Sequence, residues 1–224
     1  MTNEKDLNMS IAIDGPAGSG KSTIAKKLSQ IYKLMYINTG AMYRAVTLVA
    51  LKNKVLPSEV EKLQELVLRL NMHFENDRLF LDGVDINDEI TTPYIGNNVS
   101  DYAAVKEVRE ILVKLQQDMA GKYGVIMDGR DIGTVVLKNS KFKFFLTAAA
   151  KERAKRRFDE FKNKGIEVDF DNILSDIIKR DYIDTHRETN PLTKAIGAIV
   201  IDSSLMNVEQ VVQSITEHIN KSII

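Results

Sequence analysis

The chain has no cysteine among its 224 residues. This excludes disulfide bonds, thiol catalysis and a cysteine-based zinc site, and it fits a reducing compartment, so we expect a cytoplasmic protein. No apolar run approaches the roughly 18 residues that a membrane-spanning helix needs. The polar stretch Met1–Asn8 does not have the pattern of a secretory signal. We interpret it as a disordered leader, or Met9 as an alternative start, and we expect no membrane association.

The chain also lacks a net charge, because 31 Lys and Arg residues balance 31 Asp and Glu residues. No overall field therefore draws the protein to nucleic acid, and we expect no nucleic-acid partner. Internal repeats and low-complexity segments are absent from the sequence as well. A site for anions must come from a local cluster of basic residues.

Short apolar runs alternate with longer amphipathic stretches, which is typical of a parallel sheet built from βαβ units. This pattern predicts an α/β fold with a five-stranded parallel sheet flanked by helices. The predicted strands are Ser10–Asp14, Met35–Asn38, Val125–Met127, Phe142–Leu146 and Ile199–Ile201. The predicted helices are Lys21–Tyr32, Ala41–Leu51, Val105–Gly121, Ala149–Asn163, Ile173–Tyr182 and Val208–Ile219.

Two segments interrupt this alternation. Asn71–Ile90 has roughly alternating polarity around turn signals at Asn76-Asp77 and Asp82-Gly83, which predicts an inserted antiparallel hairpin. Lys162–Asp171 is polar and separates two helices. We predict a single domain over residues 1–224, with a core of 9–70, 98–157 and 172–224, an insert at about 71–97 and a second insertion at about 158–171.

A glycine-rich motif follows the first predicted strand and precedes the first predicted helix. It consists of Gly15, Pro16, Ala17, Gly18, Ser19, Gly20, Lys21, Ser22 and Thr23. The spacing G-x-x-x-x-G-K-[ST] predicts a P-loop whose backbone N–H groups bind the phosphates of ATP. Lys21 would reach the β- and γ-phosphates, and the Ser22 hydroxyl would ligate Mg²⁺. The alternative is a glycine-rich turn without a ligand, which the strand–loop–helix context disfavours.

Arginines recur beyond the carboxyl ends of the predicted strands, where open α/β sheets bind ligands. They are Arg44, Arg130, the group Arg153, Arg156 and Arg157, and the pair Arg180 and Arg187 with Asp184 between them on one helix face. Each alone could be an ordinary solvated side chain or a surface ion pair. Together with a P-loop they indicate phosphoryl transfer between two anions, whose repulsion fixed cations must offset. An acceptor phosphate with a second pKa of about 6 needs no general base.

Three motifs resemble those of the bacterial cytidylate (CMP/dCMP) kinases, of the P-loop nucleoside monophosphate kinase superfamily. The motifs are Ile13–Thr23, Thr39–Arg44 and Met127–Val136, and the resemblance extends from about Ser10 to Ile219. It implies a P-loop NTPase fold in which the insert binds the monophosphate and residues 158–171 form a short lid. It also implies the substrates CMP and dCMP.

The resemblance implies site residues as well. The acceptor nucleotide would be bound by Thr39, Arg44, Ser100, Arg109, Arg130, Asp131, Arg180, Asp184 and Arg187. Lys21, Arg130 and Arg187 would be catalytic, and Arg153 and Arg157 would contact ATP. Asn38 stands where the family more often has Asp.

The implied reading of the base has a physical rationale. Asp131 and Ser100 can accept from the cytosine amine while Arg109 donates to the ring acceptors; uracil reverses this pattern at two atoms.

Two alternatives remain. One is another small-molecule P-loop kinase, for UMP or shikimate, which the Arg130-Asp131 pair and the number of arginines disfavour. The other is a GTP-dependent regulatory switch, which would need a guanine-reading Asn-Lys-x-Asp motif that the sequence lacks. We expect a monomer, because no predicted helix has a long apolar stripe left for a partner.

Overall fold

The computed structural model describes residues 9–163 and 165–223, so the interpretation of Met1–Asn8 lies outside the described residues. Its main strands are β1 (Ser10–Asp14), β2 (Met35–Asn38), β6 (Val125–Gly129), β7 (Phe142–Thr147) and β8 (Ile199–Asp202). Its main helices are α1 (Lys21–Tyr32), α2 (Thr39–Lys52), α6 (Lys106–Ala120), α7 (Ala150–Asn163), α8 (Phe170–His186) and α9 (Val208–Ile223). These elements confirm every predicted strand and helix, with ends that move by up to four residues.

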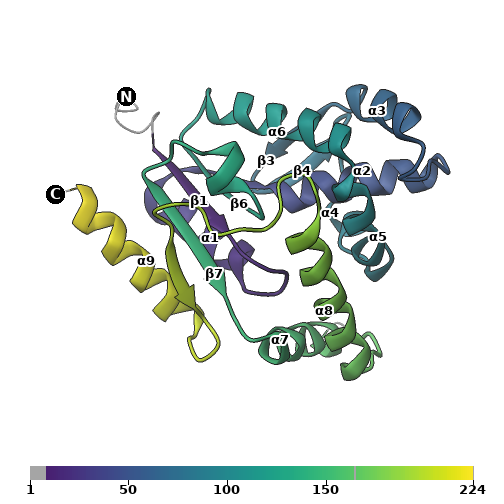
Figure 1. The fold of residues 1–224 in the computed structure, drawn as a ribbon. Coiled ribbons are helices and arrows are strands. Elements are labelled where there is room, and N and C mark those ends of the chain that lie inside the picture. Colours follow the sequence, from purple (N-terminus) through teal and green to yellow (C-terminus); the bar gives the residue numbers. More distant parts are fainter. Residues whose placement is uncertain (1–8, 164, 224) are drawn as a thin grey trace.

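The main sheet has five strands in the order β2-β6-β1-β7-β8, and all neighbours pair in parallel (Figure 1). Strand β1 is central, with Asp14 opposite Gly129 of β6 and Phe145 of β7. The carboxyl ends of all five strands therefore lie at one edge. The loops that follow β1, β2 and β6 come together there.

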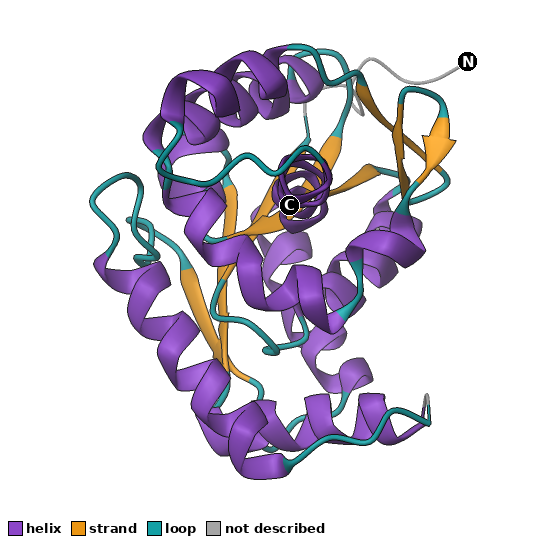
Figure 2. Cartoon of the chain, turned by 90° about the vertical axis from the view of Figure 1, so that its right-hand side faces the viewer, coloured by secondary structure: helices purple, strands orange, loops and turns teal. Residues whose placement is uncertain are grey.

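Both faces of this sheet are covered by helices (Figure 2). Alternate residues of β1 point to opposite faces: Ile11 and Ile13 pack in the same core as α1 and α9, whereas Ala12 packs in the core with α2 and α6. Because the central strands β1 and β6 are buried on both sides, their sequences are mostly continuous apolar runs rather than alternating ones. This is why short apolar runs sufficed to predict the strands.

The inserted segment contains a small antiparallel sheet of three strands, β3 (Met72–Glu75), β4 (Arg78–Leu81) and β5 (Val84–Asp85). The predicted hairpin is confirmed, and a third short strand extends it. Asn76 and Asp77 have φ values of 48° and 62°, as tight hairpin turns require. Asp82 and Gly83 form the second turn, with φ values of 51° and 80°.

Four helical elements were not predicted. They are α3 (Val60–Leu68), α4 (Asn87–Ile90), α5 (Pro93–Ala104) and a π-helix, η1 (Ile132–Val136). Helix α5 carries a recognisable start signal, because Thr92 accepts a hydrogen bond from the Ile95 N–H and Pro93 follows it. The predicted segment boundary at 97/98 falls inside α5, and the boundary at 157/158 falls inside α7.

Helices α7 and α8 form a unit of their own beside the sheet (Figure 1). Ala154, Phe161, Ile173 and Ile177 make a small hydrophobic core between them, separate from the two cores of the main sheet. This pair is thereby held mainly by its own contacts. In the described part of the chain, no helix is long and apolar enough to cross a membrane.

Candidate active site

The phosphate loop joins β1 to α1 at the carboxyl edge of the sheet. Gly15 has a φ of 150°, and a Cβ there would lie 2.0 Å from the Leu146 carbonyl oxygen. Only glycine fits this close approach of the loop to β7. The loop leads into the N-terminus of α1, whose free N–H groups and dipole favour an anion.

Lys21, the first residue of α1, is buried and folds back over this loop. Its ammonium donates to the Pro16 carbonyl at 2.7 Å and lies 3.4 Å from the Ser19 hydroxyl. Burial lowers the pKa of Lys21 to about 7, and the nearby Arg130 acts in the same direction. A bound phosphate would offset both effects, so this lysine is placed to gain a charged partner.

The Ser22 hydroxyl donates to the Asp128 carboxylate at 2.9 Å. Asp128 also accepts from the Tyr36 hydroxyl at 2.7 Å, which fixes its orientation. A hydroxyl beside one carboxylate is a suitable oxygen donor set for Mg²⁺, which keeps several waters and phosphate ligands of its own. Among the described residues there is no group of three or more His, Cys, Asp or Glu side chains that could hold a metal.

Asp128 and Tyr36 were not among the predicted site residues. A signal for Asp128 was available, because it directly follows the predicted buried strand Val125–Met127 and starts the Asp128-Gly129-Arg130-Asp131 run. Tyr36 had no such signal, since a tyrosine in a strand is normally a core residue.

A buried ion pair joins Arg109 of α6 to Asp131, which precedes η1. The two side chains are 1% and 5% exposed, and their nearest atoms are 2.5 Å apart. Arg109 also donates to the Ala103 carbonyl at 3.1 Å and lies 5.1 Å from the centre of the Tyr43 ring. Within the described part of the chain, Arg109 Nε and the Tyr43 hydroxyl have no hydrogen-bond partner. The cluster therefore has spare polar groups in a buried setting, as recognition of a polar ring requires.

Asp184 of α8 is surrounded by three arginines. Arg130 Nε donates to it at 2.7 Å, Arg187 Nη1 lies at 3.7 Å and Arg180 Nε at 3.9 Å. Burial by itself would raise the pKa of Asp184, but Arg130 and Arg180 outweigh it and hold the pKa below its usual value. Arg187 also lies 3.9 Å from Asp131, so it links this cluster to the Arg109–Asp131 pair. Arg180 and Asp184 share one face of α8 as predicted, but Arg187 follows the end of the helix in an extended conformation and approaches Asp184 from there.

Positive charge exceeds negative charge in this region. Burial lowers the pKa of Arg44 to about 10, with Arg157 and Arg130 adding to the effect. Burial likewise lowers the pKa of Arg180 to about 9, and here Arg130 is the largest charged contributor. Arginines that lower each other's pKa form a local excess of cations. Such an excess is suited to a multiply charged anion.

Three other predicted residues have different environments. The Thr39 hydroxyl donates to the Asp128 carbonyl at 2.7 Å, which ties the start of α2 to the end of β6. Arg44 donates to the Ile90 carbonyl at 3.1 Å, so it connects α2 to the inserted segment. Ser100 is partly exposed on α5. Ser100, Arg109 and Asp131 are all described in the structure, and no hydrogen bond joins Ser100 to either of the other two.

The predicted ATP-side arginines lie on α7. Arg153 is buried and donates to the Ala17 carbonyl of the phosphate loop at 3.0 Å, and to Asp181 of α8 at 2.6 and 3.0 Å. It thus connects the loop to the α7–α8 pair. Arg157 lies 4.4 Å from the centre of the Phe161 ring and pairs with Glu160 at 3.1 Å. Asp181 was not predicted, because a single acidic residue on a helix carries no distinguishing pattern.

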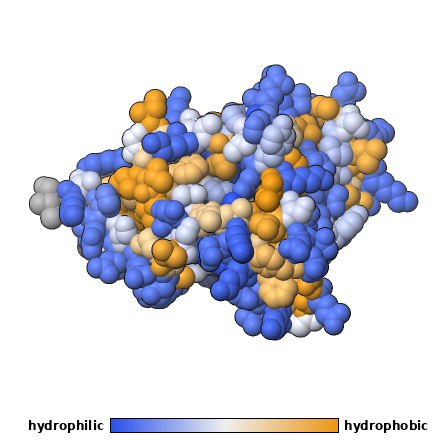
Figure 3. Space-filling view, turned by 60° about the horizontal axis from the view of Figure 1, so that its bottom comes forward, coloured by the Kyte–Doolittle hydropathy of each residue, from blue (hydrophilic) through white to orange (hydrophobic). Residues whose placement is uncertain are grey.

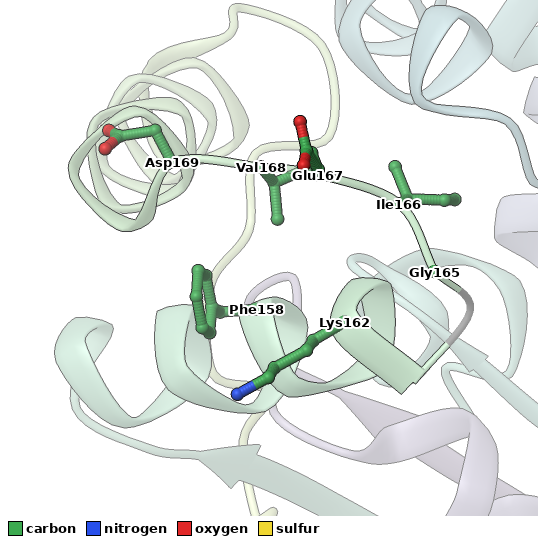
Figure 4. Close-up of a pocket in the computed structure, with 7 residues that line it drawn as sticks. All are labelled: Phe158, Lys162, Gly165, Ile166, Glu167, Val168 and Asp169. Atoms are coloured by element: carbon green, nitrogen blue, oxygen red, sulfur yellow. The ribbon is translucent and has the colours of Figure 1, made fainter.

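A pocket of about 670 Å³ opens where α7 ends and α8 begins. Phe158 and Val168 point toward one another across it, and Lys162 lies beside Phe158 on α7 (Figure 4). Its lining comes from α7 and from residues 165–169, which lead into α8. The packing between the two helices is therefore incomplete at this end.

Comparison with known proteins agrees with this geometry. Residues 11–221 match the family model described as cytidylate kinase. A cytidylate kinase of Clostridium acetobutylicum is 58% identical over 217 residues, which is 97% of this chain and all of the relative. One of Clostridium perfringens is 57% identical over 95% of this chain and 98% of the relative. A solved but uncharacterised protein of Eubacterium ventriosum shares the fold, with a TM-score of 0.52 and 15% identity over 96% of this chain and 99% of that chain. The phosphate loop, the arginine cluster and the match over nearly the whole sequence lead to one conclusion: this chain belongs to the cytidylate kinase family.

Proposed function

We propose that this protein transfers the γ-phosphoryl group of ATP to CMP, and also to dCMP, with Mg²⁺ as the metal ion. The observation that carries the proposal is the convergence, at one edge of the sheet, of a phosphate loop, an excess of arginines and the buried Arg109–Asp131 pair. Membership of the cytidylate kinase family supports the same substrate.

In this proposal the acceptor monophosphate binds among Arg44, Arg130 and Arg187. All three are close to other cations, and the pKa values of Arg44 and Arg187 are lowered mainly by burial. A phosphate dianion would remove much of that penalty, because each guanidinium can donate two parallel hydrogen bonds to phosphate oxygens. Arg180 and Asp184 would lie on the ribose side.

The cytosine base would be read by Asp131 and Arg109, with Ser100 completing the contacts after movement of α5. The spare Arg109 Nε and the Tyr43 hydroxyl are further candidates for contact with the base. A buried site built for the cytosine pattern would disfavour uracil, because polar groups would remain unpaired.

On the ATP side, residues Gly15–Thr23 would bind the phosphates and Lys21 would follow the transferring group. Ser22 and Asp128 would hold Mg²⁺, whose charge offsets that of the phosphate oxygens. Lys21, Arg130 and Arg187 would stabilise the charge that develops during transfer. Arg153 and Arg157 would contact ATP from α7. No side chain needs to act as a base, because the acceptor phosphate is already largely ionised at pH 7.

We also propose that residues 71–97 and 158–171 move when both substrates bind. The first segment is connected to the site through Arg44 and Ile90, and the second belongs to the α7–α8 pair that carries Arg153 and Arg157. Closure would exclude water and limit hydrolysis of ATP.

The substrate assignment is tested by measuring ADP formation from ATP with CMP, dCMP, UMP, AMP and GMP in turn. We expect CMP and dCMP to have the highest kcat/KM, with UMP lower because its base reverses two hydrogen-bonding groups. Equal rates with all five nucleotides, or activity only with another acceptor, would refute the proposal.

We further propose a monomer. Large exposed apolar side chains come from different elements, including Ile31 of α1, Tyr94 of α5 and Tyr182 of α8. On the face shown in Figure 3, hydrophilic residues lie between separate groups of hydrophobic ones. Scattered exposed apolar residues are normal on a monomer surface.

A further inference from the structure

Asp14 is a buried carboxylate that the proposed reaction does not use. It is the last residue of β1, directly before Gly15 of the phosphate loop, and it is only 2% exposed. Its two oxygens accept from the Ile132 N–H at 2.8 Å and the Gly133 N–H at 2.7 Å. These are charge-assisted hydrogen bonds, which are the stronger kind.

The two N–H groups belong to the segment that carries the acceptor-side residues. Asp131 directly precedes Ile132, and Arg130 precedes Asp131. Gly133 fits this approach closely, because a Cβ there would lie 3.2 Å from the Asp14 carboxylate and 3.1 Å from Ala195 Cβ. One carboxylate thus holds the start of η1 against the end of β1.

Building on the proposed function, we propose that Asp14 is a positioning residue that fixes Arg130 and Asp131 relative to the phosphate loop. In the proposed function, the loop after β1 binds the donor phosphates and the segment after β6 binds the acceptor nucleotide. The pairing of these two strands ends at Asp14 and Gly129, and the Asp14 side chain continues the connection past that point. Phosphoryl transfer requires the two phosphates to be positioned accurately, because a misplacement of about 1 Å can cost roughly a hundredfold in rate. Loss of the connection between the two segments would therefore lower both the turnover and the preference for CMP over UMP.

The energetics support a role beyond holding the fold. Burial raises the pKa of Asp14 to about 6, which the two backbone hydrogen bonds only partly offset, and Asp131 adds to the increase. A buried carboxylate with a raised pKa destabilises the native state at neutral pH. Groups of this kind are concentrated at functional sites.

The test is the variant Asp14→Asn, which keeps the shape but turns one acceptor into a donor facing a backbone N–H. We expect kcat/KM for CMP to fall roughly ten- to a hundredfold, because the acceptor segment is displaced. The CMP-to-UMP preference should narrow, because Asp131 is no longer held in place. Affinity for a non-hydrolysable ATP analogue should change less than about twofold, since Gly15–Thr23 keep their own contacts.

Ser140→Ala is the matched control. Ser140 also anchors backbone at β1, by donating to the Ser10 carbonyl at 2.6 Å, but at the opposite end of the strand. We expect its CMP-to-UMP ratio to equal that of the wild type. In the double variant Asp14→Asn with Asp131→Ala, the ratio should be no lower than in Asp131→Ala alone, because Asp14 acts on the ratio through Asp131.

If Asp14→Asn does not fold, Gly133→Ala is the alternative, because the added methyl group displaces the Asp14 carboxylate without removing it. This variant should also lower the preference for CMP over UMP. An unchanged ratio and turnover in the folded variant overturn the positioning role. So does an equal loss of ATP and CMP affinity, as a general loss of structure would give. Absence of CMP kinase activity in the wild-type protein would instead refute the proposed function.

Discussion

The Asp131 carboxylate has two roles at the scale of a single residue, since it pairs with Arg109 and is the proposed acceptor for the cytosine amine. We predict that Asp131→Ala lowers kcat/KM for CMP far more than for UMP, because a uracil carbonyl is repelled by the carboxylate that the variant lacks. A lost hydrogen bond to a charged group is typically about 1.5–3 kcal/mol, or roughly ten- to a hundredfold in preference. Steady-state kinetics with both nucleotides measures the ratio.

Asp131→Asn is the companion variant. Both substitutions leave Arg109 buried without its charged partner, but asparagine keeps the shape of the side chain and one acceptor oxygen. Thermal unfolding of both variants separates loss of structure from loss of recognition. A CMP-to-UMP ratio equal to that of the wild type in both folded variants would locate base recognition elsewhere.

Asp14 gives a pH dependence whose sign follows from its environment. Burial raises the pKa of Asp14 to about 6, against an ordinary value of 3.8, while Lys21 opposes and Asp131 reinforces the shift. Between these two values the native protein holds a proton at Asp14 that the unfolded chain does not. Its contribution to stability therefore grows as pH falls from about 6 toward 4, by up to about 1.4 kcal/mol per pH unit.

This prediction is measured by urea unfolding of the wild type and Asp14→Asn at several pH values. The stability of the wild type relative to the variant should increase as the pH falls through this window. A constant difference between the two proteins would show that Asp14 titrates normally.

How far the site could be predicted from the sequence depends on the kind of contact. Lys21 and Ser22 were predicted from a motif, and Arg130, Asp131 and Asp184 from the family resemblance, because in both cases the side chains themselves form the recognisable pattern. Asp14 acts on backbone N–H groups 118 and 119 residues away, and any residue other than proline supplies such a group. No pattern of side chains marks that kind of connection.

At the scale of elements, the buried strands were predictable because both faces are covered and the runs are continuously apolar. The π-helix Ile132–Val136 was not, because it has only five residues and depends on the Asp14 carboxylate at its start. The third strand of the insert, β5, has two residues and was below the length at which alternation can be recognised.

We predict that two elements respond to substrates. Amide hydrogen exchange in the three-stranded insert and in residues 165–171 should slow when a non-hydrolysable ATP analogue and CMP are bound together, because closure buries these segments. Peptides from β1 and β6 in the sheet core are the internal reference, and their exchange should not change. Equal exchange of the two segments in the free and doubly liganded protein would contradict closure.

At the scale of the whole molecule, a formal net charge of zero coexists with a concentrated excess of arginine at one edge of the sheet. Ligand anions should therefore stabilise the fold. A ligand at about 100 times its Kd contributes about 2.7 kcal/mol, and a chain of this size gains roughly 2–4 °C in Tm per kcal/mol. We predict a rise in Tm of several degrees with CMP, and a further rise when the ATP analogue is added.

UMP at the same concentration is the control for this measurement and should raise the Tm less than CMP does. A Tm that is unchanged by CMP would contradict binding at the arginine cluster, and equal shifts with CMP and UMP would contradict base selection by Asp131 and Arg109.

The central position of β1 has a consequence for synthesis on the ribosome. Its neighbours β6 and β7 begin at Val125 and Phe142. Val125, the partner of Ser10, is therefore synthesised 115 residues after Ser10. At about 5–20 residues per second, translation takes roughly 6–23 s to supply that partner. During this interval an apolar strand and the phosphate loop have left the ribosome without the sheet that covers them. The nascent chain is then a substrate for chaperones that shield exposed apolar segments, and its nucleotide site forms only after more than half of the protein has been made.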